Sequence, residues 1–269
     1  VSLPEVKGQQ TNSICHSQPR LSHTMYDLTQ LTFQDVTEIG NYLRKLGKEA
    51  DSLETVADRC VQYLRGCFMD PATQDSACAL VRFFKTYSYS QLPGELQQTA
   101  QTLIGQPIAD SVKCLTLMGT TGDQADWCDR TLSQGHQAIP LTSEKAVEQI
   151  PMISQLIKAF ELDISCVLAP DPHLLVALER KTCNVFHIPD ALGSEFIPAQ
   201  QTFVEPCGIR SVVGFGGMLP SGELFAIILF TKVAVPAQTA QLFKVLPLNI
   251  KMAIAPFLKK NAFRALQSV

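Results

Sequence analysis

Two apolar segments joined by a short turn restrict the fold of this chain more than any other part of its sequence. Residues 210–219 are strand-like, and residues 224–232 are rich in Phe, Ile and Leu. Between them, Pro220-Ser221-Gly222-Glu223 places Pro where a type I turn prefers it and Gly where a positive φ is needed. A turn this short joins antiparallel strands, because parallel strands need a long crossover. We therefore predict an antiparallel hairpin whose second strand, apolar on both faces, lies inside a sheet.

The remaining apolar patterns alternate between strand-like and helical. Pro151 is expected to open a second helix within residues 142–160, and Pro247 and Pro256 to bend the last helix, because each lacks a backbone N–H. Since the last two strands connect by a tight turn, the pattern predicts an α+β fold around one mostly antiparallel sheet. The predicted strands are 77–87, 113–119, 164–169 and 182–188, and the predicted helices are 94–104, 142–160, 171–181 and 236–258, with an irregular helical stretch over 195–205.

A helical rhythm precedes the first of these strands. Apolar residues recur at alternating steps of three and four from Val36 to Cys67, across a break at Gly47. Thr32 and Asp35 have the spacing of a capping box, and in Asp51-Ser52-Leu53-Glu54 a carboxylate follows a cap by three residues. The rhythm is typical of two amphipathic helices that face a core, and also of a coiled-coil seam. In the second interpretation this seam forms a homodimer.

Composition excludes several classes of protein. With 46% hydrophobic and 17% charged residues the chain is not disordered, and a net charge of −3 without a long basic run argues against nucleic-acid binding. No apolar stretch reaches the roughly 18 residues of a membrane-spanning helix, so we expect no membrane insertion. The nine Cys include no C-x-x-C pair, and several lie in apolar runs, which indicates a reducing, cytoplasmic compartment.

Several segments resemble the GAF domain family. Asn184-Val185-Phe186-His187-Ile188-Pro189-Asp190-Ala191 looks like the GAF strand that ends in a small acidic turn, and residues 208–230 look like its closing hairpin and central strand. Residues 51–68 and 236–258 resemble its first and last helices. The resemblance implies a single GAF-like domain over residues 33–260, with N- and C-terminal helices flanking the sheet and an enlarged insertion at about 105–181.

The ends of the chain complete this domain organisation. Residues 1–32 are predicted to be a disordered leader or linker; alternatively, the native start is Met25, which directly precedes the first patterned segment. Residues 261–269 are predicted to begin a linker to an output domain.

A narrower resemblance concerns function. Residues 79–86 and Gly135-His136-Gln137-Ala138-Ile139-Pro140 resemble the N-terminal input module of bacterial, cyanobacterial-type sensor histidine kinases. This implies a sensory domain in two-component signal transduction. It would bind a small ligand or a partner and act, through its terminal helices, on a kinase or cyclase output domain in cis or in trans. The chain itself is then not an enzyme, and the resemblance names no cofactor.

Six residues are candidates for ligand binding. His187 and Phe186 are neighbours in a strand, so one of them points toward the sheet face that GAF folds use as a pocket floor. His187 is alternatively a core histidine bonded to the backbone. Arg210 can pair an anionic ligand or form a salt bridge at the rim.

The other three candidates lie in a glycine-rich strand and a polar loop. Phe215 belongs to Gly214-Phe215-Gly216-Gly217, whose glycines indicate a bulge or the close approach of a ligand or helix and lack phosphate-loop spacing. Trp127, the only Trp, can cap a pocket or pin the loop, and His136 can be a ligand or a solvated loop residue. The five His have no metal-ligand spacing, so no metal is predicted.

Two other functions remain open. One is a GAF-type enzyme like the free methionine-sulfoxide reductases, which need a nucleophilic Cys and a resolving Cys in the pocket. The candidates would be Cys114, Cys128, Cys183 and Cys207, although their surroundings do not match that family. The other is a ligand-free scaffold for dimerisation or docking.

Overall fold

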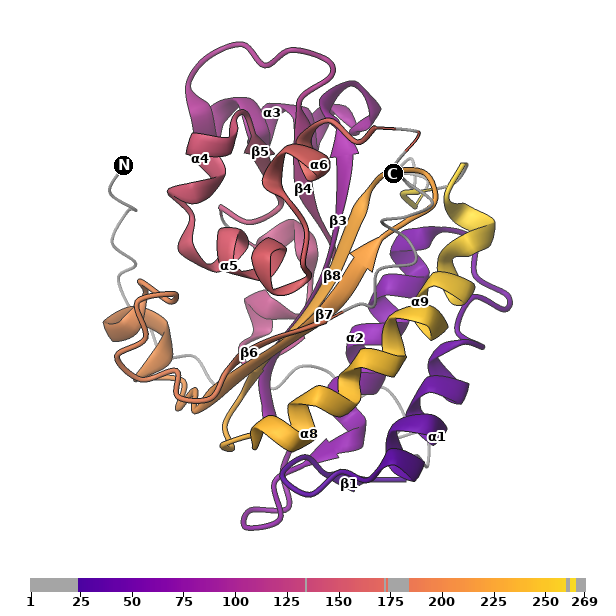
Figure 1. Cartoon of the computed structure of the whole chain (residues 1–269), viewed down its shortest axis with the longest axis vertical. Helices are drawn as coiled ribbons and strands as arrows, with labels where there is room; N and C mark the ends of the chain where they lie inside the picture. Colours follow the sequence, from indigo (N-terminus) through magenta and orange to yellow (C-terminus); the bar gives the residue numbers. More distant parts are fainter. Residues whose placement is uncertain (1–23, 134, 172, 174–183, 260–261, 265–269) are drawn as a thin grey trace.

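The centre of the molecule is one six-stranded sheet. The computed structural model describes residues 24–133, 135–171, 173, 184–259 and 262–264. The strand order is β5-β4-β3-β8-β7-β6, and every neighbouring pair is antiparallel (Figure 1). The strands are β3 (Cys78–Ser88), β4 (Lys113–Gly122), β5 (Ala138–Leu141), β6 (Val185–Ile188), β7 (Ser211–Met218) and β8 (Leu224–Thr231). The predicted α+β fold with an antiparallel sheet is confirmed.

The predicted hairpin is β7 and β8. Their register runs from Ser211 opposite Thr231 to Met218 opposite Leu224. At the turn, the N–H of Gly222 donates to the carbonyl of Leu219 at 2.9 Å, and the φ of Gly222 is +87°. All of β8 is buried, because it lies between β3 and β7 and is covered on both faces. The prediction of an internal second strand is therefore correct.

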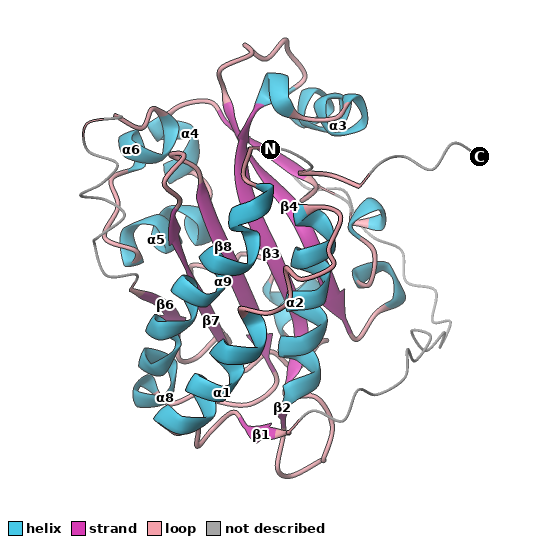
Figure 2. Cartoon of the chain, turned by 90° about the vertical axis from the view of Figure 1, so that its right-hand side faces the viewer, coloured by secondary structure: helices cyan, strands magenta, loops and turns pink. Residues whose placement is uncertain are grey.

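Helices cover both faces of the sheet (Figure 2). We call the two sides the bundle face, covered by α1, α2, α8 and α9, and the α5 face, covered by α4, α5 and α6; each has its own apolar core. A further helix, α3 (Gly94–Ile104), packs against the edge strand β5. The bounds are α1 (Phe33–Leu43), α2 (Leu53–Cys67), α4 (Glu144–Glu148), α5 (Pro151–Ala159), α6 (Ile164–Leu168), α8 (Ala237–Leu242) and α9 (Leu246–Ile254).

The periodic apolar residues of the N-terminal region pack into the core of the chain itself. The capping box is present, since the N–H of Asp35 donates to Thr32 Oγ1 at 3.2 Å and that of Thr32 donates to Asp35 Oδ2 at 2.8 Å. Eight rhythm residues are fully buried in the bundle-face core and so cannot form a homodimer seam, which corrects that interpretation: Val36, Ile39, Leu43, Leu53, Ala57, Cys60, Leu64 and Cys67. By contrast, Leu248 and Met252 of α9 are large apolar side chains that are exposed.

The leader also ends earlier than predicted. A short parallel pair joins β1 (Tyr26–Asp27) to β2 (Phe68–Met69), and Leu28 and Leu31 are buried in the bundle-face core. Residues 26–31 thus belong to the folded domain, because they supply apolar side chains to it. Residues 1–23 lie outside the described part of the chain.

One predicted strand is wrong. The predicted strand 164–169 is instead the short helix α6 (Ile164–Leu168), whose Ile164 and Val167 point into the α5-face core. A short apolar run fits a helix turn as well as a strand, so only its packing decides. Most of the predicted helix 171–181 lies outside the described residues.

The prolines act as predicted. Pro151 opens α5 after α4 has ended, and 3₁₀ turns at Phe243–Val245 and Ala255–Phe257 interrupt the closing helix beside Pro247 and Pro256. The irregular stretch contains a π-helical turn, Gln200–Val204. No described helix combines the length and apolar character needed to cross a membrane.

Candidate functional site

A buried arginine lies in the middle of the sheet, on its α5 face. Arg82 is at the centre of β3, between Leu80 and Phe84, both of which belong to the α5-face core. Alternate strand residues share a face, so Arg82 points the same way. Its neighbours across the sheet are Thr120 of β4 and Ile228 of β8. Only 9% of Arg82 is exposed, so its charge is removed from water.

The guanidinium of Arg82 is incompletely paired. Its Nη2 donates to Ser133 Oγ at 3.2 Å, while Nε is buried and has no hydrogen-bond partner. Within the described residues no carboxylate forms an ion pair with it. Burial lowers the pKa of Arg82 to about 10, so the group still carries its charge at neutral pH. A buried charge without a counter-ion is unfavourable, which makes this position a candidate for an anionic ligand.

A polar loop, residues 123–133, covers this part of the α5 face. It supplies Ser133 to Arg82, and the carbonyl of Trp127 accepts from Thr120 Oγ1 at 3.0 Å. The Trp127 ring lies directly over Gly122, where a Cβ would be 2.7 Å from ring atom Cε3. Trp127 also meets Phe203 edge-on, with centroids 5.6 Å apart. The only Trp of the chain therefore lies one row from Arg82.

The same loop reaches the C-terminal segment through Arg130. Arg130 Nε and Nη2 donate to the two carboxylate oxygens of Glu54 at 2.7 and 3.3 Å, and this pair is largely buried. The backbone N–H of Arg264 donates to the same carboxylate at 3.0 Å. The Arg130 guanidinium lies 5.9 Å from the Phe263 ring centroid. Glu54 thus joins α2, the loop and residues 262–264. The N-cap of α2 is Ser52, whose Oγ accepts from the N–H of Thr55 at 3.1 Å.

Two of the sequence candidates lie on the α5 face. They are Trp127 in the loop and Phe186, which packs beside Gly214 and near Leu156 of α5. Phe186 and Arg82 lie in one row across the sheet, with β8 and β7 between their strands. Three strand spacings separate them by about 14 Å. These side chains line the same face but do not meet.

Two others lie on the bundle face. His187 Nε2 is 2.9 Å from the carbonyl oxygen of Val235, and burial lowers the pKa of His187 against the effect of this bond. Phe215 is fully buried, with its ring centroid 5.6 Å from that of Phe243. His187 thus has the backbone bond of a core histidine, and Phe215 is part of the helix-packing core.

The last two candidates are exposed. Arg210 bonds through its backbone N–H to the carbonyl of Thr231 at 2.7 Å, and His136 follows the loop that covers Arg82. The glycines around Phe215 permit close contacts: Gly214 faces Phe186, and a Cβ at Gly216 would lie 2.1 Å from the carbonyl oxygen of Phe225. The structure does not bring the six candidates together.

Two of the four cysteines that a reductase would need have raised pKa values. Burial raises the pKa of Cys114 to about 11 and also raises that of Cys207, whereas a nucleophilic Cys needs a lowered pKa. Cys128 donates weakly to the carbonyl of Gly122, and Cys183 lies outside the described residues. Within the described ranges, no three His, Cys, Asp or Glu side chains cluster as metal ligands.

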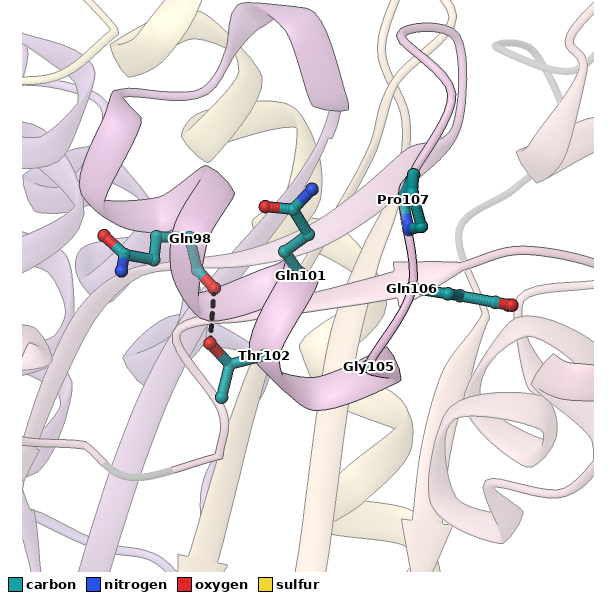
Figure 3. A pocket seen from close by; sticks show the side chains of 6 residues that line it. All are labelled: Gln98, Gln101, Thr102, Gly105, Gln106 and Pro107. Atoms are coloured by element: carbon teal, nitrogen blue, oxygen red, sulfur yellow. Dashed lines mark hydrogen bonds between the residues drawn. The ribbon is translucent and has the colours of Figure 1, made fainter.

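The open hollows of the surface are weaker candidates for a ligand site than the surroundings of Arg82. One, of about 370 Å³, lies at the C-terminal end of α3 and is lined by Gln98, Gln101, Thr102, Gly105, Gln106 and Pro107 (Figure 3). It holds amide and hydroxyl groups but no charged or aromatic side chain. Arg82 lines neither this hollow nor the second one, at α5; it is buried among apolar side chains and two hydroxyl groups, and it is a candidate because of its unsatisfied donor.

Sequence reasoning missed Arg82, although a signal was present. Arg82 and Lys85 are the only charged residues in Cys78–Ser88, a strand that is otherwise apolar or hydroxylic. A charged residue inside a buried strand needs a partner. The sequence does not show which partner the sheet supplies.

Comparison with known proteins gives distant similarities only. Neither a protein-family model nor a curated protein matches this chain. Among solved structures, it is similar to the free methionine-R-sulfoxide reductase from Neisseria meningitidis in complex with its substrate, with 9% identity, a TM-score of 0.44, and coverage of 87% of this chain and 99% of that one. It is also similar to the bacteriophytochrome RpBphP3 from R. palustris, with 11% identity, a TM-score of 0.34, and coverage of 84% of this chain and 40% of that one.

Proposed function

We propose that this chain is a GAF-like sensory domain that binds a small ligand on its α5 face and transmits the binding to its C-terminal segment. The loop of residues 123–133 is the observation that carries the proposal. It contacts buried Arg82 through Ser133, and it reaches Arg264 in the C-terminal segment through the Arg130–Glu54 pair. One loop therefore links the two faces of the sheet.

The coupling follows from the short distance along the loop. A ligand at the guanidinium lies next to Ser133, which accepts a hydrogen bond from the same group, and Ser133 is only three residues from Arg130. A shift of the loop changes how Arg130 holds Glu54 and packs near Phe263. The ligand then favours one of two arrangements of the C-terminal segment, which is a population shift. In the sensor proteins that the chain resembles, an output domain follows such a segment.

The output domain we propose is a histidine kinase or a cyclase, in cis or in trans. The resemblance of residues 79–86 and 135–140 to kinase input modules supports it. A homodimer remains part of the proposal, but it would use side chains outside the buried N-terminal rhythm, such as the exposed Leu248 and Met252 of α9.

A screen of small metabolites by thermal unfolding, followed by hydrogen exchange, tests this function. We expect a stabilising compound to change amide exchange both in residues 128–133 and in residues 262–264. In E54Q/R130M, which removes both charges of the pair, binding is expected to remain while the response at 262–264 is lost. R65Q is the matched control, because Arg65 pairs with Asp123 at the far end of the loop. A compound that binds without any change at 262–264 would contradict transmission.

The reductase is not favoured by any observation of the site, since the thiols of Cys114 and Cys207 have raised pKa values. A ligand-free scaffold would show no stabilising compound at all in the same screen.

A further inference from the structure

We infer that Arg82 binds the carboxylate of a small organic monoanion, held between the sheet and the loop of residues 123–133. The inference rests on the proposed function and specifies its ligand. It starts from the buried guanidinium of Arg82, which bonds Ser133 through Nη2 but has no partner for Nε and no ion-pair partner among the described residues.

The donors of Arg82 suit a carboxylate. Nε and Nη2 lie on the same edge of a guanidinium, and together they can donate to both oxygens of a carboxylate. At Arg82 the Nε donor has no partner, and Nη2, which donates to Ser133, has a second hydrogen to offer. Arg130 shows the occupied form in the same chain, since its Nε and Nη2 hold the two oxygens of Glu54.

The charge of the surroundings favours a single negative charge. Arg82 is the only charged residue that β3 and β8 place on this face; the others are Leu80, Phe84, Thr86, Leu224, Ala226, Ile228 and Phe230. A monocarboxylate would neutralise one guanidinium, whereas a phosphate dianion would leave an excess charge beside apolar side chains. Transfer of such a charge out of water is unfavourable.

The side chains around Arg82 indicate the chemical character of the rest of the ligand. Leu80, Phe84 and Ile228 surround Arg82 along and across the strands, so the group attached to the carboxylate meets apolar side chains. Two hydroxyl groups are close to Arg82. Ser133 Oγ accepts a hydrogen bond from it, and Thr120 is the residue opposite Arg82 on the neighbouring strand β4. We therefore assign an aliphatic or aromatic monocarboxylic acid as the ligand class.

Titration with matched carboxylates and neutral amides tests the inference. The probes are acetate, hexanoate and benzoate, with hexanamide, benzamide and inorganic phosphate for comparison. Fluorescence of Trp127, the only Trp, and the thermal midpoint report binding. We expect at least one carboxylate to bind saturably. Its amide should bind about 10- to 100-fold more weakly, the loss that corresponds to a charge-assisted hydrogen bond.

Three variants separate binding from folding. R82M and R82K should each weaken carboxylate binding about 10- to 100-fold, because one removes the charge and the other removes the paired donors. R44Q, at an exposed arginine, should bind like the wild type. Without ligand, the thermal midpoint of R82M should equal or exceed that of the wild type, since an unpaired buried charge is lost.

The outcomes distinguish this inference from the proposed function. If no carboxylate binds, or R82K binds carboxylates like the wild type, the inference is wrong. A neutral compound or phosphate that acts equally on wild type and R82M overturns the ligand class and leaves the sensory function standing. A carboxylate that binds through Arg82 but leaves exchange at residues 262–264 unchanged confirms the inference and contradicts the sensory function.

Discussion

Lys85 is a second buried cation in β3, and it points to the bundle face. Its Nζ donates to the carbonyl of Thr86 at 3.3 Å, lies 3.8 Å from Glu223 Oε2, and sits 3.6 Å from the centroid of the Tyr87 ring. Burial lowers the pKa of Lys85 to about 8, although the carboxylate of Glu223 opposes the shift. Unlike Arg82, Lys85 has a carboxylate close to it.

The lowered pKa predicts how stability depends on pH. Between pH 8 and about 10.5 the unfolded state keeps the Lys85 proton and the folded state releases it, so the free energy of unfolding rises with pH in this window. Below pH 8 both states are protonated and the effect is constant. Relative to K85M, the wild type should therefore gain up to about 3 kcal/mol from pH 8 to 10, at roughly 1.4 kcal/mol per pKa unit.

Urea unfolding of both proteins at pH 7, 8, 9 and 10 measures this difference. In the unfolded state the cysteines also titrate in this range, but they are common to both proteins and their effect cancels. A difference that does not change with pH would mean that folded Lys85 keeps its proton.

The two cations also show what one strand sequence can specify. Arg82 and Lys85 are three residues apart, so the alternation of a strand places them on opposite faces. That much follows from the sequence. Which face meets Glu223 and which meets Ser133 depends on the neighbouring strands and the covering loop.

At the scale of elements, α2 packs closely on β4. A Cβ at Gly119 would lie 2.7 Å from the carbonyl carbon of Ala57, so only glycine lets the helix backbone approach the strand this closely. Gly66, near the end of the same helix, has no atom within 4 Å of a built Cβ.

These two glycines make a matched pair of substitutions. G119A should lower the free energy of unfolding by about 1–3 kcal/mol, because the helix must move away from the sheet. G66A should raise it by about 0.5–1 kcal/mol, because alanine favours a helix over glycine and meets no obstacle. Urea unfolding measures both, and equal effects of the two substitutions would contradict the close contact.

The pattern of apolar residues predicts some elements better than others. The amphipathic helices α1 and α2 and the hairpin of β7 and β8 carry enough periodic residues and turn signals to be recognised. The five residues of α6 do not, because one turn of helix and a short strand bury the same apolar side chains.

At the scale of the whole molecule, the Glu54–Arg130 pair connects parts far apart in sequence. R130M leaves the buried Glu54 carboxylate with one backbone donor, that of Arg264. It should lower the free energy of unfolding by about 3–5 kcal/mol, the range found when one partner of a buried pair is removed.

The double variant supplies the control. E54Q/R130M should regain most of this loss, because the amide oxygen of Gln can still accept from Arg264 and no charge is left unpaired. Double-mutant analysis of urea unfolding measures the coupling. Additive effects of E54Q and R130M would mean that the two side chains do not stabilise the fold together.

The sequence by itself determined the local features: the hairpin turn at Pro220 and Gly222, the cap at Thr32, the helix breaks at prolines, and the class of an antiparallel sheet between helices. Each depends on residues within a few positions of one another, whose backbone preferences act before the chain has folded. The tertiary structure decided that the N-terminal rhythm is buried rather than free to dimerise, that Arg82 lacks an acidic partner among the described residues, and that Glu54 faces Arg130, 76 residues away. Those features depend on which distant side chains share a face of the sheet, and no local preference encodes that pairing.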